Sequence, residues 1–285
     1  MTSRKAVLIT GASSGFGEIT ARLLAERGFL VYAGVRRAED GDRVAATIGE
    51  RCVPVIIDVT DAQSIAAAAL RLREAGGIYG LVNNAGIALP GPMEYFPLDE
   101  LRRQFEVNVF GAVAVTQAML PLLRASLGRI VNVGSITGRS AIPMMGAYCS
   151  SKSALNAITN VARMELESFG IAVSYIEPGS FRTPIWNRSE AASEEMMGKF
   201  PPQALDQYSG LISGTRAFAK EQARSSGDPI AVAEAIAAAL TASRPKARYT
   251  VGKDTRMLIL LNFLPLSMRD RLLASMMAKM AKTSA

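Results

Sequence analysis

The sequence predicts an α/β protein, built as a doubly wound parallel sheet of about seven strands with helices on both faces. Two observations lead to this fold class. Short apolar runs alternate with longer helical patterns from residue 6 to residue 178. Glycine or polar residues follow the apolar runs directly, as at the carboxyl ends of parallel strands that bind ligands. We expect one domain over 1–285, because 49% hydrophobic and 20% charged residues suit a single globular core.

The first strand is expected over 6–10, and a glycine turn follows it. The turn reads Gly11-Ala-Ser-Ser-Gly-Phe-Gly17, and the helical pattern behind it carries Ile19, Leu23 and Leu24 on one side. Such a turn lets backbone N–H groups approach a pyrophosphate, and the helix dipole adds to the attraction. We favour phosphate binding over a purely structural turn, although the spacing differs from the commoner Gly-x-Gly-x-x-Gly.

The second strand is expected over 29–35, and Arg36-Arg37 follow it at once. At this place a carboxylate suits an adenosine ribose, whereas arginine suits a 2′-phosphate through paired charged hydrogen bonds. NADP(H) is therefore favoured over NAD(H). Two alternatives stay open: a solvated arginine pair that opens a helix, and a pair neutralised by the acidic residues at 39, 40 and 42.

The middle of the chain repeats the strand and helix pattern. We expect strands over 53–57 and 79–82, a helix from the N-cap Asp61 to about Ala75, and a longer helix from Leu98 to about Leu123. Asn83-Asn-Ala-Gly86 suits either the adenosine side of a nucleotide or a structural turn. Asn108 lies inside the long helical pattern, where a buried amide needs hydrogen-bond partners, and periodicity alone favours a core role.

A strand over 130–134 ends at Ser135, and the helical pattern behind it continues to about Phe169. Tyr148 and Lys152 are four residues apart, so in a helix their side chains share one face. An ammonium near a phenol favours the phenolate, so we expect Lys152 to lower the pKa of Tyr148 and make it an acid/base group. The Ser135 hydroxyl is placed to hold a substrate oxygen. Taken alone, the pentapeptide is more typical of an ordinary exposed pair on an amphipathic helix.

The sequence contains no histidine, which excludes Ser-His-Asp and Cys-His triads and His-bearing zinc sites. Cys52 and Cys149 are far apart and fit neither a metal cluster nor a disulfide framework, so we expect buried thiols, no metal and a cytoplasmic protein. The N-terminus runs straight into a strand and shows no signal peptide. The net charge of +7 is dispersed, which argues against a nucleic-acid partner.

Over residues 5 to about 183 the sequence resembles the short-chain dehydrogenase/reductase family. The matching pieces are Thr10-Gly-Ala-Ser-Ser-Gly-Phe-Gly17, Asp58, Asn83-Asn-Ala-Gly86, Asn108, Ser135, Tyr148 with Lys152, and Pro178-Gly179 with Thr183. The resemblance implies a Rossmann-type fold and hydride transfer between a nicotinamide and a carbonyl or alcohol. Length and tail look similar to the hydroxysteroid and retinol dehydrogenase-like branch. A homodimer or homotetramer is implied as well.

The resemblance also implies a role for each matching residue. Tyr148 looks like the general acid/base, Lys152 like its pKa-lowering partner, Ser135 like the holder of the substrate oxygen, and Asn108 like the asparagine that fixes a relay water. Tyr148 and Lys152 also look like cofactor contacts, and the remaining ones are Gly11, Ser13, Ser14, Phe16, Gly17, Arg36, Asp58, Val59, Asn84, Ala85, Gly86, Pro178, Gly179 and Thr183. Among them, Asp58 and Val59 look like the adenine contacts, Asn84 like a ribose-side contact and Thr183 like a partner for the nicotinamide carboxamide. Phe181 departs from the small aliphatic residue of many relatives.

The last third of the chain is expected to complete the sheet and to cover the substrate. Residues 184–227 resemble a substrate lid, with a self-packed surface insertion as the alternative. Met144 and Trp186 are expected to line an apolar pocket for a steroid-, retinoid- or lipid-like ketone. A helix is expected over 229–240 and a strand over 248–252.

The tail 253–285 holds an apolar run too short to cross a bilayer and an amphipathic basic helix over 268–280. We expect it to pack on its own protein in preference to a second subunit or a membrane surface. The leading function is an NADP(H)-dependent oxidoreductase acting on a small-molecule carbonyl or alcohol. The alternatives are an inactive NADPH-binding sensor or scaffold, and a non-redox epimerase or dehydratase.

Overall fold

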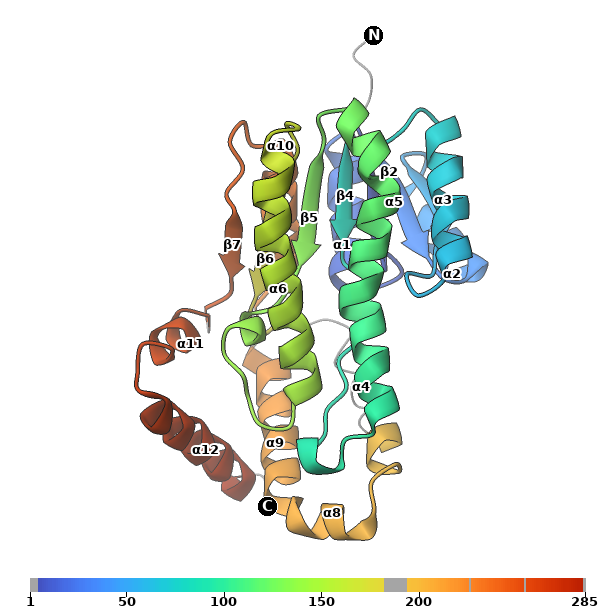
Figure 1. The fold of residues 1–285 in the computed structure, drawn as a ribbon. Coiled ribbons are helices and arrows are strands. Elements are labelled where there is room, and N and C mark those ends of the chain that lie inside the picture. Colours follow the sequence, from blue (N-terminus) through green and yellow to red (C-terminus); the bar gives the residue numbers. More distant parts are fainter. Residues whose placement is uncertain (1–4, 182–193, 226, 254, 284–285) are drawn as a thin grey trace.

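Seven parallel strands form one sheet in the order β3-β2-β1-β4-β5-β6-β7, as the computed structural model describes them (Figure 1). The description covers residues 5–181, 194–225, 227–253 and 255–283. The strands are β1 (Ala6–Thr10), β2 (Leu30–Val35), β3 (Cys52–Ile56), β4 (Gly80–Asn83), β5 (Arg129–Val133), β6 (Ala172–Pro178) and β7 (Arg248–Val251). All predicted strands are confirmed. The winding reverses between β1 and β4, so the crevice at their carboxyl ends is the expected ligand site.

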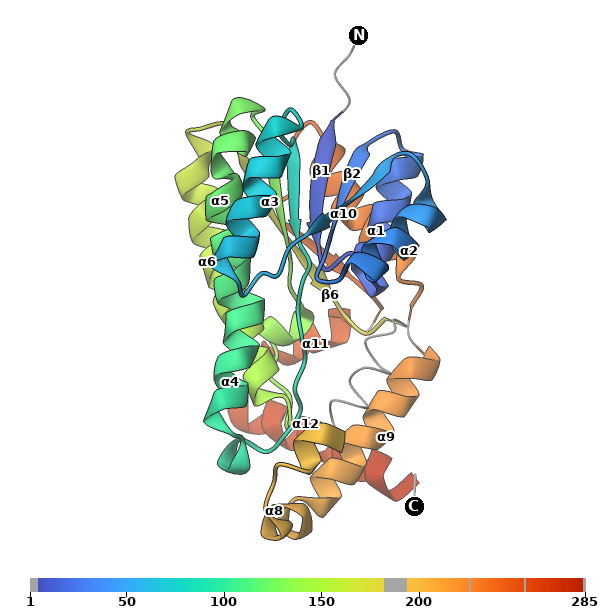
Figure 2. The ribbon, with the colours of Figure 1, turned by 90° about the vertical axis from the view of Figure 1, so that its right-hand side faces the viewer.

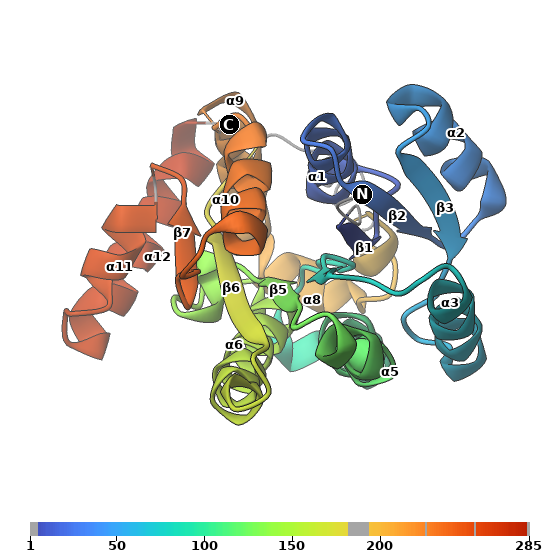
Figure 3. The same ribbon diagram turned by 90° about the horizontal axis from the view of Figure 1, so that it is seen from above.

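Two helical layers cover the sheet (Figure 3). One layer holds α1 (Gly15–Glu26), α2 (Ala38–Ile48) and α10 (Ile230–Thr241), and the other holds α3 (Ala62–Glu74), α5 (Gly111–Ala125) and α6 (Gly146–Glu167). Alternate β1 side chains point to opposite layers: Val7 and Ile9 pack with α1 and α10, whereas Leu8 packs with α3 and α5. This explains why β1 is apolar throughout, since both of its faces are buried.

The long helix predicted from Leu98 has a change of hydrogen bonding in its middle. Its segments are α4 (Leu98–Phe105), the π-helical turn η2 (Glu106–Phe110) and α5. Such π turns occur often at functional sites, and Asn108 lies in this one. Within the described residues, only the run 98–125 is long and apolar enough to cross a membrane, although it packs against the sheet and 44% of its apolar window is buried. The cytoplasmic location therefore stays a prediction.

The remaining helical elements extend beyond the carboxyl edge of the sheet (Figure 2). They are η1 (Met93–Tyr95), η3 (Ile136–Gly138), α8 (Pro202–Gln207), α9 (Ser209–Ser225), α11 (Thr255–Leu261) and α12 (Leu266–Thr283). Helix α12 lies against α9. The Ser140 hydroxyl ties α11 to the loop after η3, because it bonds to the Leu258 carbonyl at 3.2 Å and to Asn262 Oδ1 at 3.0 Å. The tail thus contacts its own protein.

Candidate active site

Ser135, Tyr148 and Lys152 lie together beyond the carboxyl end of β5. Ser135 caps η3, and its Oγ accepts hydrogen bonds from the N–H of Thr137 at 3.2 Å and from Thr137 Oγ1 at 2.9 Å. Helix α6 begins at Gly146, so Tyr148 lies in its first turn and Lys152 in the next. Ser135 lies close enough to the phenol of Tyr148 to lower its pKa by hydrogen bonding. The structure therefore places the hydroxyl and the phenol near each other.

Lys152 is turned inward, beneath the phenol. Its side chain is 5% exposed, and Nζ donates a hydrogen bond of 2.9 Å to the Val133 carbonyl. Nζ lies 5.8 Å from the centre of the Tyr148 ring. Burial disfavours the ammonium and lowers the pKa of Lys152 to about 8.

The pKa of Tyr148 moves in the direction opposite to our prediction. Burial of the phenol raises its pKa to about 12, and the hydrogen bond with Ser135 offsets only part of this rise. The net shift of the pKa is therefore upward. The expectation that the pKa of Tyr148 lies below its ordinary value is wrong for this structure. Tyr148 is a protonated phenol at neutral pH.

Asn108 connects the π turn to α6. Its Oδ1 accepts from the N–H of Ile87 at 2.9 Å, and its Nδ2 donates to the Ile87 carbonyl and to Ser151 Oγ, each at 3.0 Å. A Cβ on Gly86 would lie 3.3 Å from Asn108 Oδ1 and 3.6 Å from Lys152 Nζ, so the amide and the ammonium flank this glycine. The amide has the partners that its burial requires and also borders Lys152.

Gln104 supports the same segment, a role that sequence reasoning missed. It is fully buried, and its amide bonds to the N–H of Leu89 at 2.9 Å and to the carbonyl of Ile87 at 2.6 Å. A polar residue at an otherwise buried helix position was the available signal, as it was for Asn108.

The glycine turn holds the geometry that close approach to a phosphate needs. Gly11 and Gly15 have φ of 65° and 59°, and α1 starts at Gly15 with Ser14 as its N-cap. A Cβ on Gly17 would clash with the Gly11 carbonyl, so this position needs glycine for packing. A backbone turn with glycine at three of its seven positions, placed at a helix N-terminus, fits a pyrophosphate.

Asn84 fastens the glycine turn to β4. Its Nδ2 donates to the carbonyls of Thr10 at 2.9 Å and Gly11 at 3.1 Å, and the N–H of Ala85 donates to Thr10 Oγ1 at 3.1 Å. The amide that we predicted to bind a ribose therefore holds the backbone of the turn. Its position beside the turn agrees with the prediction, but its side-chain N–H groups already donate to the backbone carbonyls of the turn.

The two arginines after β2 differ in their surroundings. Arg37 pairs with Asp40 at 2.9 Å, whereas Arg36 is exposed and makes no ion pair within the described residues. The acidic cluster thus neutralises Arg37. Arg43, which sequence reasoning missed, donates to the Ser13 carbonyl and pairs with Glu18 at 3.3 Å. Basic groups therefore flank the turn from α2.

The predicted adenine contacts lie at the end of β3. Asp58 Oδ1 accepts from the N–H of Thr60 at 2.9 Å and from its hydroxyl at 2.7 Å. Val59 is buried at 8% exposure, and a Cβ on Gly111 of α5 would lie 2.8 Å from it. These contacts shape the loop, because the Asp58 carboxylate is engaged by its own neighbours.

The predicted nicotinamide end is only partly described. Pro178 ends β6, and the Gly179 N–H donates to the Val251 carbonyl at 2.8 Å. Phe181 is buried and packs edge-to-face on Phe16, with ring centres 5.8 Å apart. Its large ring is thus accommodated by the glycine turn. Thr183 and Trp186 lie outside the described residues.

Apolar side chains form a buried cluster that includes Ala147, the residue before Tyr148. Leu89 and Ala147 lie in it with Met196 and Phe200, which come from the predicted lid region. Met144 is half-buried with φ of 65°, and its carbonyl accepts from the Gly91 N–H at 2.7 Å. The cluster shows that part of 184–227 packs against α6.

A model of the family described as short chain dehydrogenase matches residues 5–194. The chain belongs to this family. Human retinol dehydrogenase 5 is 38% identical to it over 97% of this chain and 90% of that protein. Human 17-beta-hydroxysteroid dehydrogenase type 6 is 34% identical over 98% and 90%. These findings confirm the predicted family, its retinol and hydroxysteroid dehydrogenase-like branch, and an oxidoreductase acting on CH–OH and C=O groups.

The fold of this short chain dehydrogenase also resembles solved structures. A crystal structure of a short chain dehydrogenase from Burkholderia cenocepacia J2315 in complex with NADP has a TM-score of 0.73 and 28% identity. The match covers 94% of this chain and 97% of that one. The Rossmann-type architecture predicted from the sequence is therefore confirmed.

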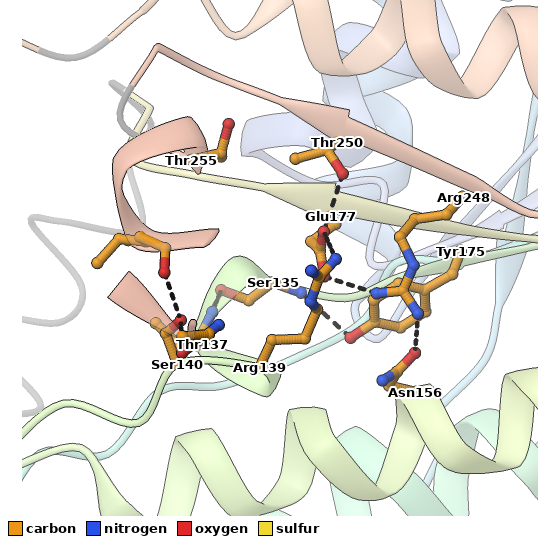
Figure 4. Close-up of polar contacts among 12 residues, drawn as sticks. Ser135, Thr137, Arg139, Ser140, Asn156, Tyr175, Glu177, Arg248, Thr250 and Thr255 are labelled. Atoms are coloured by element: carbon orange, nitrogen blue, oxygen red, sulfur yellow. Dashed lines mark hydrogen bonds and ion pairs between the residues drawn. The ribbon is translucent and has the colours of Figure 1, made fainter. Parts of the chain in front are cut away.

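Behind Ser135 the short chain dehydrogenase carries a buried ion cluster that sequence reasoning missed (Figure 4). Glu177 is 0% exposed and pairs with Arg248 at 2.7 Å and with Arg139 at 3.2 Å. Thr250 Oγ1 donates to the same carboxylate at 2.9 Å. The available signal was a carboxyl group at the end of an apolar strand, since buried carboxylates need partners.

Proposed function

We propose that this protein interconverts a ketone or aldehyde and its alcohol, using NADP(H) in preference to NAD(H), on an apolar substrate. The contact between Ser135 and Tyr148, with Lys152 one turn further along α6, carries the proposal. A hydroxyl and a phenol that lie near each other can each donate a hydrogen bond to a single substrate oxygen. This is the arrangement that carbonyl reduction needs.

When bound, the nicotinamide supplies or accepts the hydride. Ser135 donates a hydrogen bond to the substrate oxygen and so fixes the carbonyl carbon. Tyr148 then delivers its proton to that oxygen, and its raised pKa keeps it protonated for this step at neutral pH. The ammonium of Lys152 stabilises the phenolate that remains. Asn108, beside Lys152, is proposed to fix the water through which the proton is replaced.

Two observations support the coenzyme and substrate classes. Arg36 makes no ion pair within the described chain and stands at the end of β2, where it can bind a 2′-phosphate. The apolar cluster of Leu89, Ala147, Met196 and Phe200 borders Tyr148, and the named relatives include a retinol and a hydroxysteroid dehydrogenase. We therefore propose a steroid-, retinoid- or lipid-like substrate under a lid formed by 184–227. A homodimer or homotetramer is proposed from the family resemblance.

The test follows the absorbance of NADPH with a panel of apolar ketones and aldehydes, and with NADH in parallel. We expect turnover with NADPH, and we expect Tyr148→Phe to abolish it while NADPH binding, measured by fluorescence, persists. Tyr32→Phe is the matched control, because Tyr32 is a buried tyrosine of β2 outside the site. Full turnover in Tyr148→Phe contradicts the proposal. Tight NADPH binding without turnover favours a sensor, and conversion without net cofactor use favours an epimerase or dehydratase.

A further inference from the structure

A second phenol lies behind the proposed catalytic residues. Tyr175 belongs to β6 and is 1% exposed. Its hydroxyl donates to the Lys152 backbone carbonyl at 3.1 Å. It also accepts from the Ser135 N–H at 3.4 Å (Figure 4). One hydroxyl therefore bridges the end of β5 and the turn of α6 that carry the proposed chemistry.

Two glycines make room for this phenol. A Cβ on Gly134 would overlap the Tyr175 ring. A Cβ on Gly138 would lie 3.2 Å from the Tyr175 hydroxyl and 2.9 Å from the Lys152 carbonyl. The segment on either side of Ser135 thus lacks side chains where the phenol lies, so the ring approaches the backbone closely.

The buried ion cluster holds the ring in this place. The Arg248 guanidinium lies 5.3 Å from the centre of the Tyr175 ring. It is fixed by Glu177 Oε1 at 2.7 Å and by Asn156 Oδ1 at 2.8 Å (Figure 4). Glu177 also holds Arg139, which follows η3. The ring cannot move far without breaking buried charged hydrogen bonds, which are among the strong ones.

We propose that Tyr175 is a positioning residue, which sets the spacing between Ser135 and the turn of α6 that bears Tyr148 and Lys152. The proposal rests on the proposed function. Removing its hydroxyl leaves the buried Ser135 N–H and the Lys152 carbonyl without this partner, and the two segments relax relative to each other. Small displacements of reacting groups lower rates strongly, while the glycine turn, to which Tyr175 makes no contact within the described residues, keeps its geometry for the coenzyme.

Tyr175→Phe is the direct test, with Tyr32→Phe as the matched control. Both variants remove one hydroxyl from a buried strand tyrosine, and the Tyr32 hydroxyl has no hydrogen bond within the described residues. We expect Tyr175→Phe to lower kcat roughly 3- to 10-fold at unchanged KM for NADPH. We also expect it to shift the pH profile of kcat, because the contacts of Tyr148 with its neighbours set its pKa. Tyr32→Phe should change neither quantity.

Gly138→Ala disturbs the same contact between the Tyr175 hydroxyl and the Lys152 carbonyl from the segment after Ser135. It tests the positioning role if Tyr175→Phe does not fold. Its methyl group would press on the Lys152 carbonyl and the Tyr175 hydroxyl. Tyr32→Phe again serves as the control, because Tyr32 is a buried residue of β2 outside the site. We expect a loss of kcat and a shifted pH profile in Gly138→Ala alone.

The outcomes separate the two proposals. Wild-type kcat in Tyr175→Phe, or a lowered kcat with an unshifted pH profile, overturns the positioning role. The proposed function is still supported in that case if Tyr148→Phe loses turnover. Wild-type kcat in Gly138→Ala has the same meaning if Tyr175→Phe does not fold. Retained turnover in Tyr148→Phe instead overturns the proposed function itself.

Discussion

Replacing Lys152 by methionine should change how the stability of the protein depends on pH. The ordinary pKa of lysine, 10.5, is lowered to about 8 at this position by burial. Between these values the unfolded chain binds one more proton than the folded one, so the free energy of unfolding rises with pH. The difference between these two pKa values, at about 1.4 kcal/mol for each pKa unit, corresponds to about 3 kcal/mol in the free energy of unfolding. Below pH 8 the buried ammonium lowers the free energy of unfolding by this full amount, and by pH 10.5 the loss has disappeared because the folded protein holds a neutral amine.

Urea unfolding of the wild type and of Lys152→Met, in steps from below pH 8 to pH 10.5, measures this contribution. The wild-type curve should rise relative to that of the variant by about 3 kcal/mol across this interval. The hydrogen bond to the Val133 carbonyl is lost in the variant at every pH, so it shifts the curve without changing its slope. Effects of other titrating groups cancel in the difference between the two proteins.

Lys246→Met is the control for removing an ammonium group that lies in water, because Lys246 is exposed. Its curve should run parallel to that of the wild type. Parallel curves for the wild type and Lys152→Met between pH 8 and pH 10.5 would refute the assignment of a desolvated ammonium to this position.

Three further changes test other parts of the site. Ser135→Ala should lower kcat roughly 100- to 1,000-fold, the loss typical of one donor to a developing oxyanion, in NADPH-coupled assays. Arg36→Ala should raise the KM for NADPH roughly 10- to 100-fold, which is the effect of losing one charged hydrogen bond, and leave the KM for NADH unchanged. Arg37→Ala, the control, should change neither KM appreciably. Glu177→Gln should lower the free energy of unfolding by about 3–5 kcal/mol, because two partly buried guanidinium groups lose their counter-charge, and urea titration measures this. A smaller loss than about 1 kcal/mol would contradict the ion-cluster description.

The fold and the meeting of the site residues were predictable because they depend on local patterns. Parallel strands place their carboxyl ends at one edge, so the polar residue after β5 and the glycines after β1 had to lie near each other. The spacing of Tyr148 and Lys152 put both on one face of α6. Neither conclusion required knowledge of which side chains are buried.

The pKa directions and the supporting cluster were not predictable, because they depend on tertiary packing. The sign of the Tyr148 shift depends on how deeply α6 packs and where the Lys152 side chain turns. Glu177 meets Arg248, 71 positions away, only because β6 and β7 are neighbours. Likewise the Asn84 amide is used by the turn beside it, a contact set by the pairing of β1 and β4.

Burial raises the pKa of Tyr148 and lowers the pKa of Lys152. Both shifts have the same cause, because burial disfavours the charged form of each group. Proton transfer from the phenol leaves a phenolate in surroundings that stabilise it poorly. Only a nearby positive charge offsets this, and Lys152 still carries its charge below about pH 8. The protein therefore keeps a buried ammonium that lowers its stability by about 3 kcal/mol. A group that destabilises the fold but balances a charge formed during the reaction is typical of active sites, and this is the role proposed for Lys152.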